Sequence, residues 1–541
     1  MGKRRYSSRN GACLGDTEAG AILSTLFGAK EAGEAKKHQP VEAPVEIKSL
    51  DMQAVSRPKN PPPPRPPSKK KKKEQLGFKK SEAEKIYARE GLLAPAKPIE
   101  PADLSRSAKA DFGERHFETL RAMQITGNGF TAETHCEGYP SPRDVALIGE
   151  RLRLGAQEAL GMVDEQADGY IGYDMGTSAT KVAVRWPYDS QTPAFAVSVP
   201  ESWQSGQSPH LWPTAVFFNA ESGEFSLLPR PEFQRIEGFK AGVLSGSGHR
   251  MTQGFTISYS EATTAFVAMH AAYVLGAIRQ RYPQAKVSNF NCAVPVVAVK
   301  RESAHFEKIL AAAMKLVPVA DRLTISLVRQ AAENSESPTM PFEIHAELVG
   351  AIAGYQASPS RRYGPHMLID CGSATLDIVT FTDRQNVEEM PAWAASVETL
   401  GADAIRAYRN AGRASDVCLG AINYQEHRVC MRTRAHRRDG TAFSQANGVY
   451  PYQVIVTGGG IDSPLHSDWL ERIEQHFQSR FVRPELGDLA CETGCKNERL
   501  IIADGLARDP FDLRKLTLPD PETIDTNQLD ASALHDPSAY H

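Results

Sequence analysis

Two pairs of apolar segments, each interrupted by a short polar turn, stand out in the pattern of hydrophobic and polar positions. Residues 170–173 and 181–184 are rich in β-branched and aromatic side chains, and the small and polar residues between them are typical of a tight turn. Residues 367–381 repeat this order, because one apolar run ends at Asp370 and a second starts near Leu376. The pattern therefore predicts two β-hairpins with glycine-containing tips, far apart in the chain.

Two further glycine-containing segments follow the second hairpin. Residues 454–464 read as a buried strand that enters the triple-glycine turn Gly458, Gly459 and Gly460, and residues 501–507 read as part of a helix. Glycine at such turns lets another backbone or a ligand approach closely. Together with the hairpins, these segments indicate an α/β protein.

Helical periodicity is clearest ahead of the first hairpin. Residues 103–123 and 141–160 carry apolar side chains at helical spacing, and the second segment begins with a Ser-Pro pair that is typical of a helix start. We expect the folded body to begin between these two helices. Shorter helices are expected near residues 17–34 and 81–90, whereas residues 518–541 hold five acids and no Lys or Arg and read as disordered.

Composition is that of an ordinary globular protein. The 541 residues are 41% hydrophobic and 23% charged, which leaves room for two or three domains. No run reaches the roughly 18 consecutive apolar residues that a membrane span needs, and the basic start has no apolar core followed by a cleavage site. We therefore expect a cytoplasmic protein without a membrane anchor.

Positive charge is concentrated at the N-terminal end. Residues 1–80 contain 18 Lys and Arg against 8 Asp and Glu, and residues 60–75 join a proline run to five consecutive lysines. Such a segment is extended and cannot bury a core, so we predict residues 1–102 to be a mostly disordered tail. It is a solvated linker, a docking peptide for a protein partner, or an electrostatic tether to nucleic acid, for which aromatic stacking residues are lacking.

The eight cysteines are scattered, which is typical of reduced thiols rather than of a disulfide framework. Cys491 and Cys495 form a CxxxC pair, and Cys418 and Cys430 lie upstream. These four thiols would suffice for a zinc site, although neither pair has the tight CxxC spacing of zinc ribbons. Ordinary unliganded thiols are the alternative.

The two hairpin tips carry the chemistry of a phosphate site. Backbone N–H groups and Thr or Ser hydroxyls can replace the water around a polyphosphate, and glycine lets the backbone come close. Asp174 and Asp370, at corresponding positions of the two hairpins, provide hard oxygen atoms for a hydrated Mg²⁺. Each aspartate alone could equally be a turn-capping side chain. The candidate nucleotide-binding residues are Gly176, Thr177, Ser178, Gly372, Ser373, Ala374, Gly458, Gly459 and Gly460.

In the same order along the chain, these motifs resemble those of the actin, sugar-kinase and seventy-kilodalton heat-shock chaperone superfamily. Residues 174–178 resemble its first phosphate motif, residues 370–377 its second, and residues 458–460 its adenosine motif. Residues 345–355 and 503–507 resemble its two connecting helices. The resemblance implies ATP with Mg²⁺, bound between two α/β lobes that each contain a mixed sheet and flanking helices.

The resemblance also implies a division of the chain. Expected are a helical lead-in at 103–168, lobe I at 169–365, lobe II with a reduced upper subdomain at 366–502, and a connecting helix back to lobe I at 503–517.

Further short segments are similar to the nucleotide-binding domain of the heat-shock chaperones. On that resemblance Lys240 would position the attacking water, Glu347 would be the connector carboxylate near the metal, and Thr375 would lie beside the γ-phosphate, with Asp370 also in the catalytic set. An exposed lysine and a surface glutamate are the alternatives for the first two.

The expected function is an ATP-binding, slowly ATP-hydrolysing, chaperone-like switch whose N-terminal tail recruits partners. No peptide-binding domain follows the motifs, unlike in the chaperones, and Ser373 and Ala374 add side chains where that family has glycine. The alternatives are an ATP-dependent, self-assembling actin-like filament protein of the plasmid-partition or cytoskeletal kind, and a small-molecule kinase.

Overall fold

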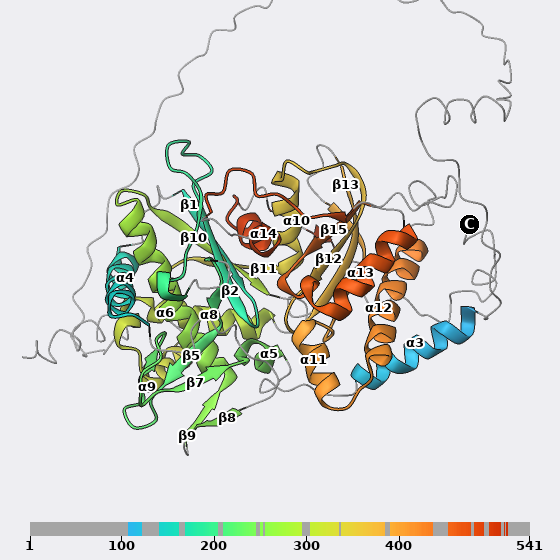
Figure 1. The fold of residues 1–541 in the computed structure, drawn as a ribbon. Helices are drawn as coiled ribbons and strands as arrows, with labels where there is room; N and C mark the ends of the chain where they lie inside the picture. Colours follow the sequence, from blue (N-terminus) through green and yellow to red (C-terminus); the bar gives the residue numbers. More distant parts are fainter. Residues whose placement is uncertain are drawn as a thin grey trace, which may run out of the picture. The chain divides into compact units, whose positions relative to one another are not determined.

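The computed structural model describes residues 106–121, 140–161, 168–203, 209–244, 249–252, 255–294, 303–334, 337–384, 390–436, 453–477, 481–491, 497–509, 513 and 516–517. They form a mixed α/β structure with two six-stranded sheets, two smaller sheets and eleven α-helices within these ranges (Figure 1). The tails expected at 1–102 and 518–541 lie outside the described residues.

The first large sheet has the strand order β11-β10-β1-β2-β3, with β4 also paired to β2. The strands β1 and β2 form the predicted first hairpin, and β1 is buried along almost its whole length. β1 pairs in parallel with β10 on its other side, so it lies at the centre of the sheet. The bounds are β1 Gly169–Met175, β2 Ala179–Arg185, β3 Phe195–Ala196, β4 Trp212–Pro213, β10 Val287–Val294 and β11 Phe342–Ala346.

The second large sheet has the order β16-β15-β12-β13-β14-β17. The strands β12 and β13 form the predicted second hairpin, and β15 is the strand predicted before the triple glycine. The bounds are β12 Gly364–Cys371, β13 Leu376–Asp383, β14 Met390–Glu398, β15 Gln453–Thr457, β16 Phe481–Val482 and β17 Leu516–Thr517. Because both sheets contain an antiparallel hairpin beside a parallel strand, both are mixed.

The first sheet packs on a helix that is buried on nearly every side, α6 (Tyr259–Arg281). A capping box at Ser258 and Glu261 starts this helix. Helix α4 (Pro142–Leu160) crosses it at very short range, because a Cβ on Gly155 would lie 1.8 Å from the carbonyl oxygen of Ala272. α6 is also the one described helix long and apolar enough to span a membrane, but 94% of that apolar window is buried in the protein, which is typical of a core helix.

Helices α11 (Ala402–Asn410), α12 (Ser415–His436) and α13 (Pro464–Phe477) accompany the second sheet. Helix α3 (Arg106–Arg121) packs on α12 through the ring of Phe117, which lies 5.3 Å from the ring of Tyr424. The folded part therefore begins one helix earlier than the sequence indicated. Helical periodicity predicted this helix, but periodicity does not identify the element on which a helix packs.

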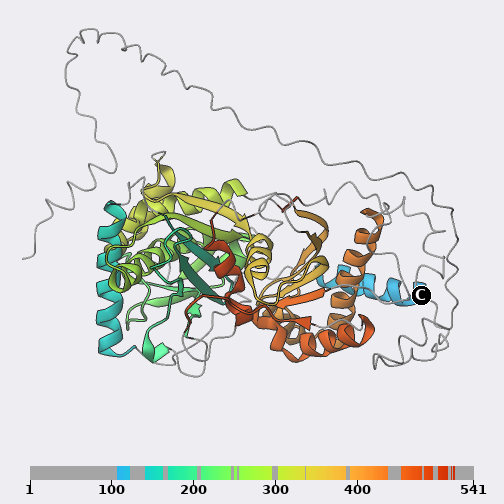
Figure 2. The same cartoon turned by 90° about the horizontal axis from the view of Figure 1, so that it is seen from above.

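Two helices lie against each other between the large sheets, α10 (Glu347–Ala357) and α14 (Asn497–Leu506) (Figures 1 and 2). Glycine permits this contact, because a Cβ on Gly505 would lie 1.9 Å from the carbonyl oxygen of Gly350. The expectation of a connecting helix at 503–517 was wrong in its bounds. The helix starts earlier and ends at Leu506, and β17 near the end of that range belongs to the second sheet.

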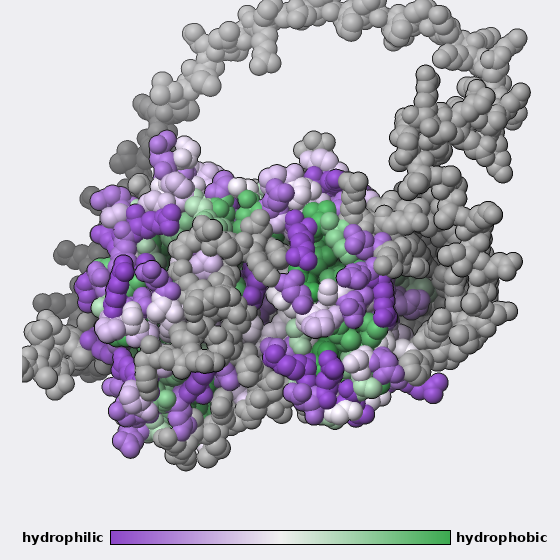
Figure 3. All heavy atoms as spheres, in the orientation of Figure 1, coloured by the Kyte–Doolittle hydropathy of each residue, from purple (hydrophilic) through white to green (hydrophobic). Residues whose placement is uncertain are grey.

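Smaller elements complete the body, and one of them carries a candidate site residue. Lys240 lies on the short helix α5 (Phe239–Leu244), directly after a three-stranded sheet of order β6-β5-β7. The remaining elements are β5 Ala215–Phe218, β6 Phe225–Ser226, β7 Gln234–Glu237, β8 His249–Thr252, β9 Phe255–Ser258, α8 Ser303–Leu316, α9 Ile325–Glu333 and the 3₁₀ segments Glu201–Trp203, Val317–Arg322 and Gly459–Asp462. On the face drawn in Figure 3, most side chains along the edges of the molecule are hydrophilic, and apolar side chains are visible between them.

Candidate functional site

All fourteen residues that the sequence singled out line one cavity of about 340 Å³. They come from the two hairpin tips, from α5, from the start of α10 and from the turn after β15. The set is Asp174, Gly176, Thr177, Ser178, Lys240, Glu347, Asp370, Gly372, Ser373, Ala374, Thr375, Gly458, Gly459 and Gly460. The first hairpin and the triple-glycine turn are far apart in the sequence, and they thus line the same polar cavity.

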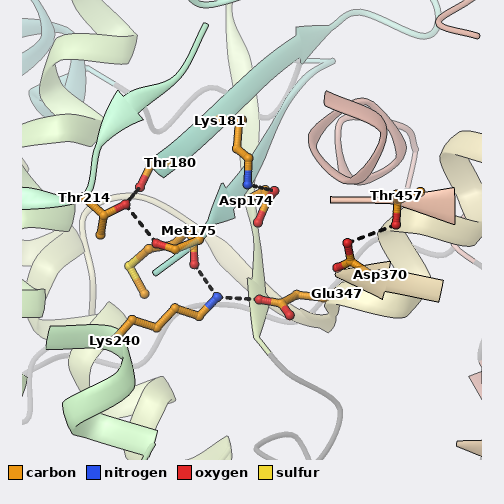
Figure 4. A network of polar contacts seen from close by, with 10 residues as sticks. Asp174, Met175, Thr180, Lys181, Thr214, Lys240, Glu347, Asp370 and Thr457 are labelled. Atoms are coloured by element: carbon orange, nitrogen blue, oxygen red, sulfur yellow. Dashed lines mark hydrogen bonds and ion pairs between the residues drawn. The ribbon is translucent and has the colours of Figure 1, made fainter. Parts of the chain in front are cut away.

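Hydrogen bonds from the Thr214 side chain support the tip of the first hairpin. The Thr214 hydroxyl donates to the carbonyl oxygen of Gly176 over 2.8 Å and lies 2.9 Å from the Thr180 hydroxyl (Figure 4). The N–H groups of Thr177 and Ser178 donate to no described residue. They are therefore available to a ligand in the cavity.

The tip of the second hairpin is held by the first turn of α11. The carbonyl oxygens of Gly372, Ser373 and Ala374 accept hydrogen bonds of 2.8–3.0 Å from backbone N–H groups at residues 401–403, and the Ser373 hydroxyl donates to Asp403 over 2.6 Å. With its carbonyl oxygens engaged in this way, the turn retains free donors. The N–H groups of Ser373, Ala374 and Thr375 donate to no described residue. Successive free N–H groups of this kind form an anion-binding nest.

The triple-glycine turn packs directly on the second hairpin. Gly458 has φ +88°, and a Cβ there would lie 2.2 Å from the carbonyl oxygen of Cys371. A Cβ on Gly460 would lie 2.5 Å from the carbonyl oxygen of Gly372. Only glycine fits both positions, so the two turns form one continuous backbone wall of the cavity.

Two lysines bring positive charge to the same place. The Lys181 ammonium lies 2.7 Å from Oδ2 of Asp174, and the Lys240 ammonium donates to the carbonyl oxygen of Met175 and to Glu347 (Figure 4). Burial alone would lower the pKa of Lys240, but the carboxylates of Glu347 and Asp174 outweigh it and raise that pKa above its ordinary value. Lys240 is therefore a buried cation at neutral pH, and not the exposed lysine of the alternative interpretation.

The carboxylates opposite these lysines are crowded together. Burial, with the charges of Glu347 and Asp174, raises the pKa of Asp370 to about 7, although Thr457 donates a hydrogen bond to it over 3.0 Å. Asp377 stands directly across the hairpin from Asp370 and is 1% exposed. Burial and the charges of Glu347 and Asp370 raise the pKa of Asp377 well above its ordinary value, although a hydrogen bond from the Thr375 side chain acts in the opposite direction.

Several charged residues of the site were not predicted from the sequence. Asp377 was visible in the second motif, since its position opposite Asp370 follows from the hairpin register. Lys181 had a weaker signal, a lone charge in an otherwise apolar strand. Asp403, Arg406 and Arg499 line the cavity from helices whose sequences give no local sign of it.

Metal coordination by protein side chains alone is not supported within the described ranges, where no group of three or more His, Cys, Asp or Glu could hold an ion. The zinc hypothesis fails on geometry for Cys418 and Cys430. They are both on α12, where twelve residues correspond to about 18 Å of helix. Cys491 is partly exposed, and Cys495 lies outside the described residues.

The cavity as a whole is suited to a polyanion accompanied by a cation. It combines free backbone donors on opposite walls, two ammonium groups and several carboxylates. Comparison with models of known protein families gives no match for this chain, and comparison with curated proteins gives none either.

Proposed function

We propose that the cavity binds ATP with Mg²⁺, and that the protein hydrolyses it slowly to ADP and phosphate as a chaperone-like molecular switch. One observation carries this proposal. Two hairpin tips from different sheets carry N–H groups that donate to no described residue, and these tips line one cavity together with a triple-glycine turn and two lysines. A polyphosphate is the common biological ligand that needs so many donors and so much positive charge in one place.

The roles of the residues follow from their positions. The N–H groups at Thr177, Ser178 and residues 373–375 would bind phosphate oxygens from two sides. The turn at residues 458–460 lines the cavity and would lie against the nucleoside. Lys181 could exchange its contact with Asp174 for a phosphate oxygen.

The residues present fit Mg²⁺ rather than a fully caged metal. Mg²⁺ usually retains several waters and takes one or two carboxylates plus substrate phosphates, which agrees with a site that lacks three clustered ligands among the described residues. Asp174 and Asp370 would hold its waters. When bound, the ion would neutralise part of the charge on the polyphosphate.

For hydrolysis, the Lys240 ammonium lines the cavity and is held in position by its ion pair with Glu347. The Lys240 ammonium can orient water and stabilise the negative charge that develops on the transferred phosphoryl group. The Thr375 hydroxyl lies on the second hairpin beside the free donors and would contact the same group. Both roles depend on positioning, since phosphoryl transfer needs little covalent chemistry from the protein.

The two-lobed actin-like fold is part of this proposal. It is supported by the repetition of a hairpin and a parallel strand in both large sheets, and by the crossing of α10 and α14 between them. We also propose that residues 1–102 recruit a protein partner and that the protein acts in the cytoplasm. A filament and a small-molecule kinase would use the same cavity.

Phosphate release from Mg-ATP, measured over a series of protein concentrations, tests the proposal. The expected rate is linear in protein and is lost in Asp370→Ala, whereas Glu201→Gln, at an exposed residue outside the cavity, leaves it unchanged. Release that starts only above a threshold concentration would favour the filament, and release only with an added acceptor would favour the kinase. Failure of wild-type protein to bind Mg-ATP in calorimetry would overturn all three.

A further inference from the structure

A second cavity, of about 280 Å³, lies on the first sheet beyond the candidate nucleotide site. Edge strand β3 and the residues after it form one side, the last turn of α6 forms another, and Arg151 of α4 completes the lining. It shares no lining residue with the first cavity. The second cavity can therefore bind a ligand of its own, independently of the proposed ATP site.

The Arg151 side chain in this cavity is held in a fixed position. Its Nε donates to Oε1 of Gln280 over 2.9 Å, and its Nη1 donates to the hydroxyl of the buried residue Tyr273. The guanidinium carbon also lies 5.0 Å from the centre of the Tyr273 ring. The Tyr273 hydroxyl in turn donates to the carbonyl oxygen of Ser198 over 2.9 Å, so its oxygen is left to accept from Arg151. Such a prepositioned guanidinium loses little entropy when it binds an anion.

Arg281 supplies a second positive charge from the end of α6. Its guanidinium carbon lies 4.6 Å from the centre of the Phe195 ring and 5.6 Å from that of Tyr282. Within the described residues, neither Arg151 nor Arg281 forms an ion pair with a carboxylate, and the described lining of the cavity contains no Asp or Glu. By contrast, the neighbouring Arg279 lies 3.7 Å from Glu158.

The rest of the lining is apolar and buried. Phe195, Ala196, Val197 and Ala277 are each no more than 6% exposed. Two guanidinium groups of fixed charge above such a floor create a strong preference for an anion with an apolar body. We propose that this cavity binds a small organic oxyanion, a carboxylate or phosphate carried on an aromatic or short aliphatic group. Its volume lies just below the range of about 300–1,000 Å³ that is typical of ligand pockets, which suits a small ligand.

Ligand-observed NMR titration of the full-length protein tests this proposal with three probes of matched size: benzoate, phenyl phosphate and the neutral benzamide. We expect benzoate or phenyl phosphate to bind and benzamide to bind at least about tenfold more weakly, because it lacks the charge that two guanidinium groups attract. The stronger of the two anions identifies whether the natural ligand carries a carboxylate or a phosphate.

Arg281→Gln should weaken anion binding by about tenfold or more, since it removes a charge from the cavity while Phe195 and the helix remain. Arg279→Gln is the matched control, because it removes an arginine from the same helical turn outside the cavity, and it should change binding less than about twofold. Equal losses in both variants would reveal a general surface attraction and overturn the proposal. So would equally tight binding of benzamide, or no binding of either anion to the wild-type protein.

Discussion

The ammonium of Lys181 lies 2.7 Å from the carboxylate of Asp174 inside the candidate nucleotide cavity. The two residues face each other across the first hairpin, where the strand register pairs them directly. Asp174 is 2% exposed, so in the absence of ligand the lysine is what compensates its charge. The charges of Lys181 and Asp174 therefore compensate each other within the cavity. A ligand that binds the Lys181 ammonium has to replace its contact with Asp174.

Removing this partner should destabilise the free protein. In Lys181→Gln the Asp174 carboxylate remains buried without its cation, which costs roughly 1–3 kcal/mol. The free energy of unfolding, measured with urea, should fall by that amount and partly recover when Mg²⁺ is added. Lys286→Gln breaks an ion pair with Glu158 at a half-buried lysine and should cost less than about 1 kcal/mol. Equal losses in both variants would show that the pair in the cavity is not specially buried.

The pair of Lys240 and Glu347 can be examined by a double-mutant cycle. Lys240→Met leaves Glu347 buried and unpaired and should cost roughly 3–5 kcal/mol. Adding Glu347→Gln should restore much of this stability, because no uncompensated charge remains. ATP hydrolysis should stay absent in the double variant. Recovery of hydrolysis together with stability would assign Lys240 a purely structural role.

Stability should depend on pH through Asp370. Its pKa is about 7 in the folded protein and lies above its ordinary value because of burial, so the folded state retains a proton that the unfolded state has lost. The contribution is therefore full at low pH and is lost as pH rises toward 7, by up to about 1.4 kcal/mol per pH unit. Urea unfolding in metal-free buffer should show wild type losing stability relative to Asp370→Asn between pH 4.5 and 7. A constant difference would mean that Asp370 ionises normally.

The contact between α10 and α14 should not tolerate a methyl group. In Gly505→Ala the new Cβ would overlap the carbonyl oxygen of Gly350, and displacing the helices should cost roughly 1–3 kcal/mol. Gly149→Ala, on the exposed face of α4 with no atom near the new Cβ, should instead add about 0.5–1 kcal/mol. Denaturation midpoints of the two variants should therefore move in opposite directions.

The sequence predicted the two hairpins well because runs of β-branched and aromatic residues and glycine-containing turns are local signals. The strands at 170–173 and 181–184 lie inside β1 and β2, and the second hairpin and the strand before Gly458 are also confirmed. The same local signals located every cavity residue on the turns. These local signals did not predict the residues that hold each turn in position.

That support is formed by residues distant in sequence. The hydrogen bonds from α11 to the second hairpin depend on Asp403 and its neighbours, whose sequence is that of an ordinary helix start. Arg499 reaches the cavity only because α14 crosses between the sheets. The helix expected at 503–517 ran past Pro510, although a proline is a local signal that a helix ends before it.

The packing of α3 and α4 has a practical consequence for anyone who trims this chain. Phe117 and Leu120 of α3 belong to the apolar cluster of the second sheet, and Ile148 and Ala159 of α4 belong to that of the first. A recombinant fragment cut just before the first hairpin would leave both clusters uncovered and should be recovered mainly as insoluble material. A fragment that starts ahead of Arg106 retains both covers, and it is the shorter form suited to crystallisation.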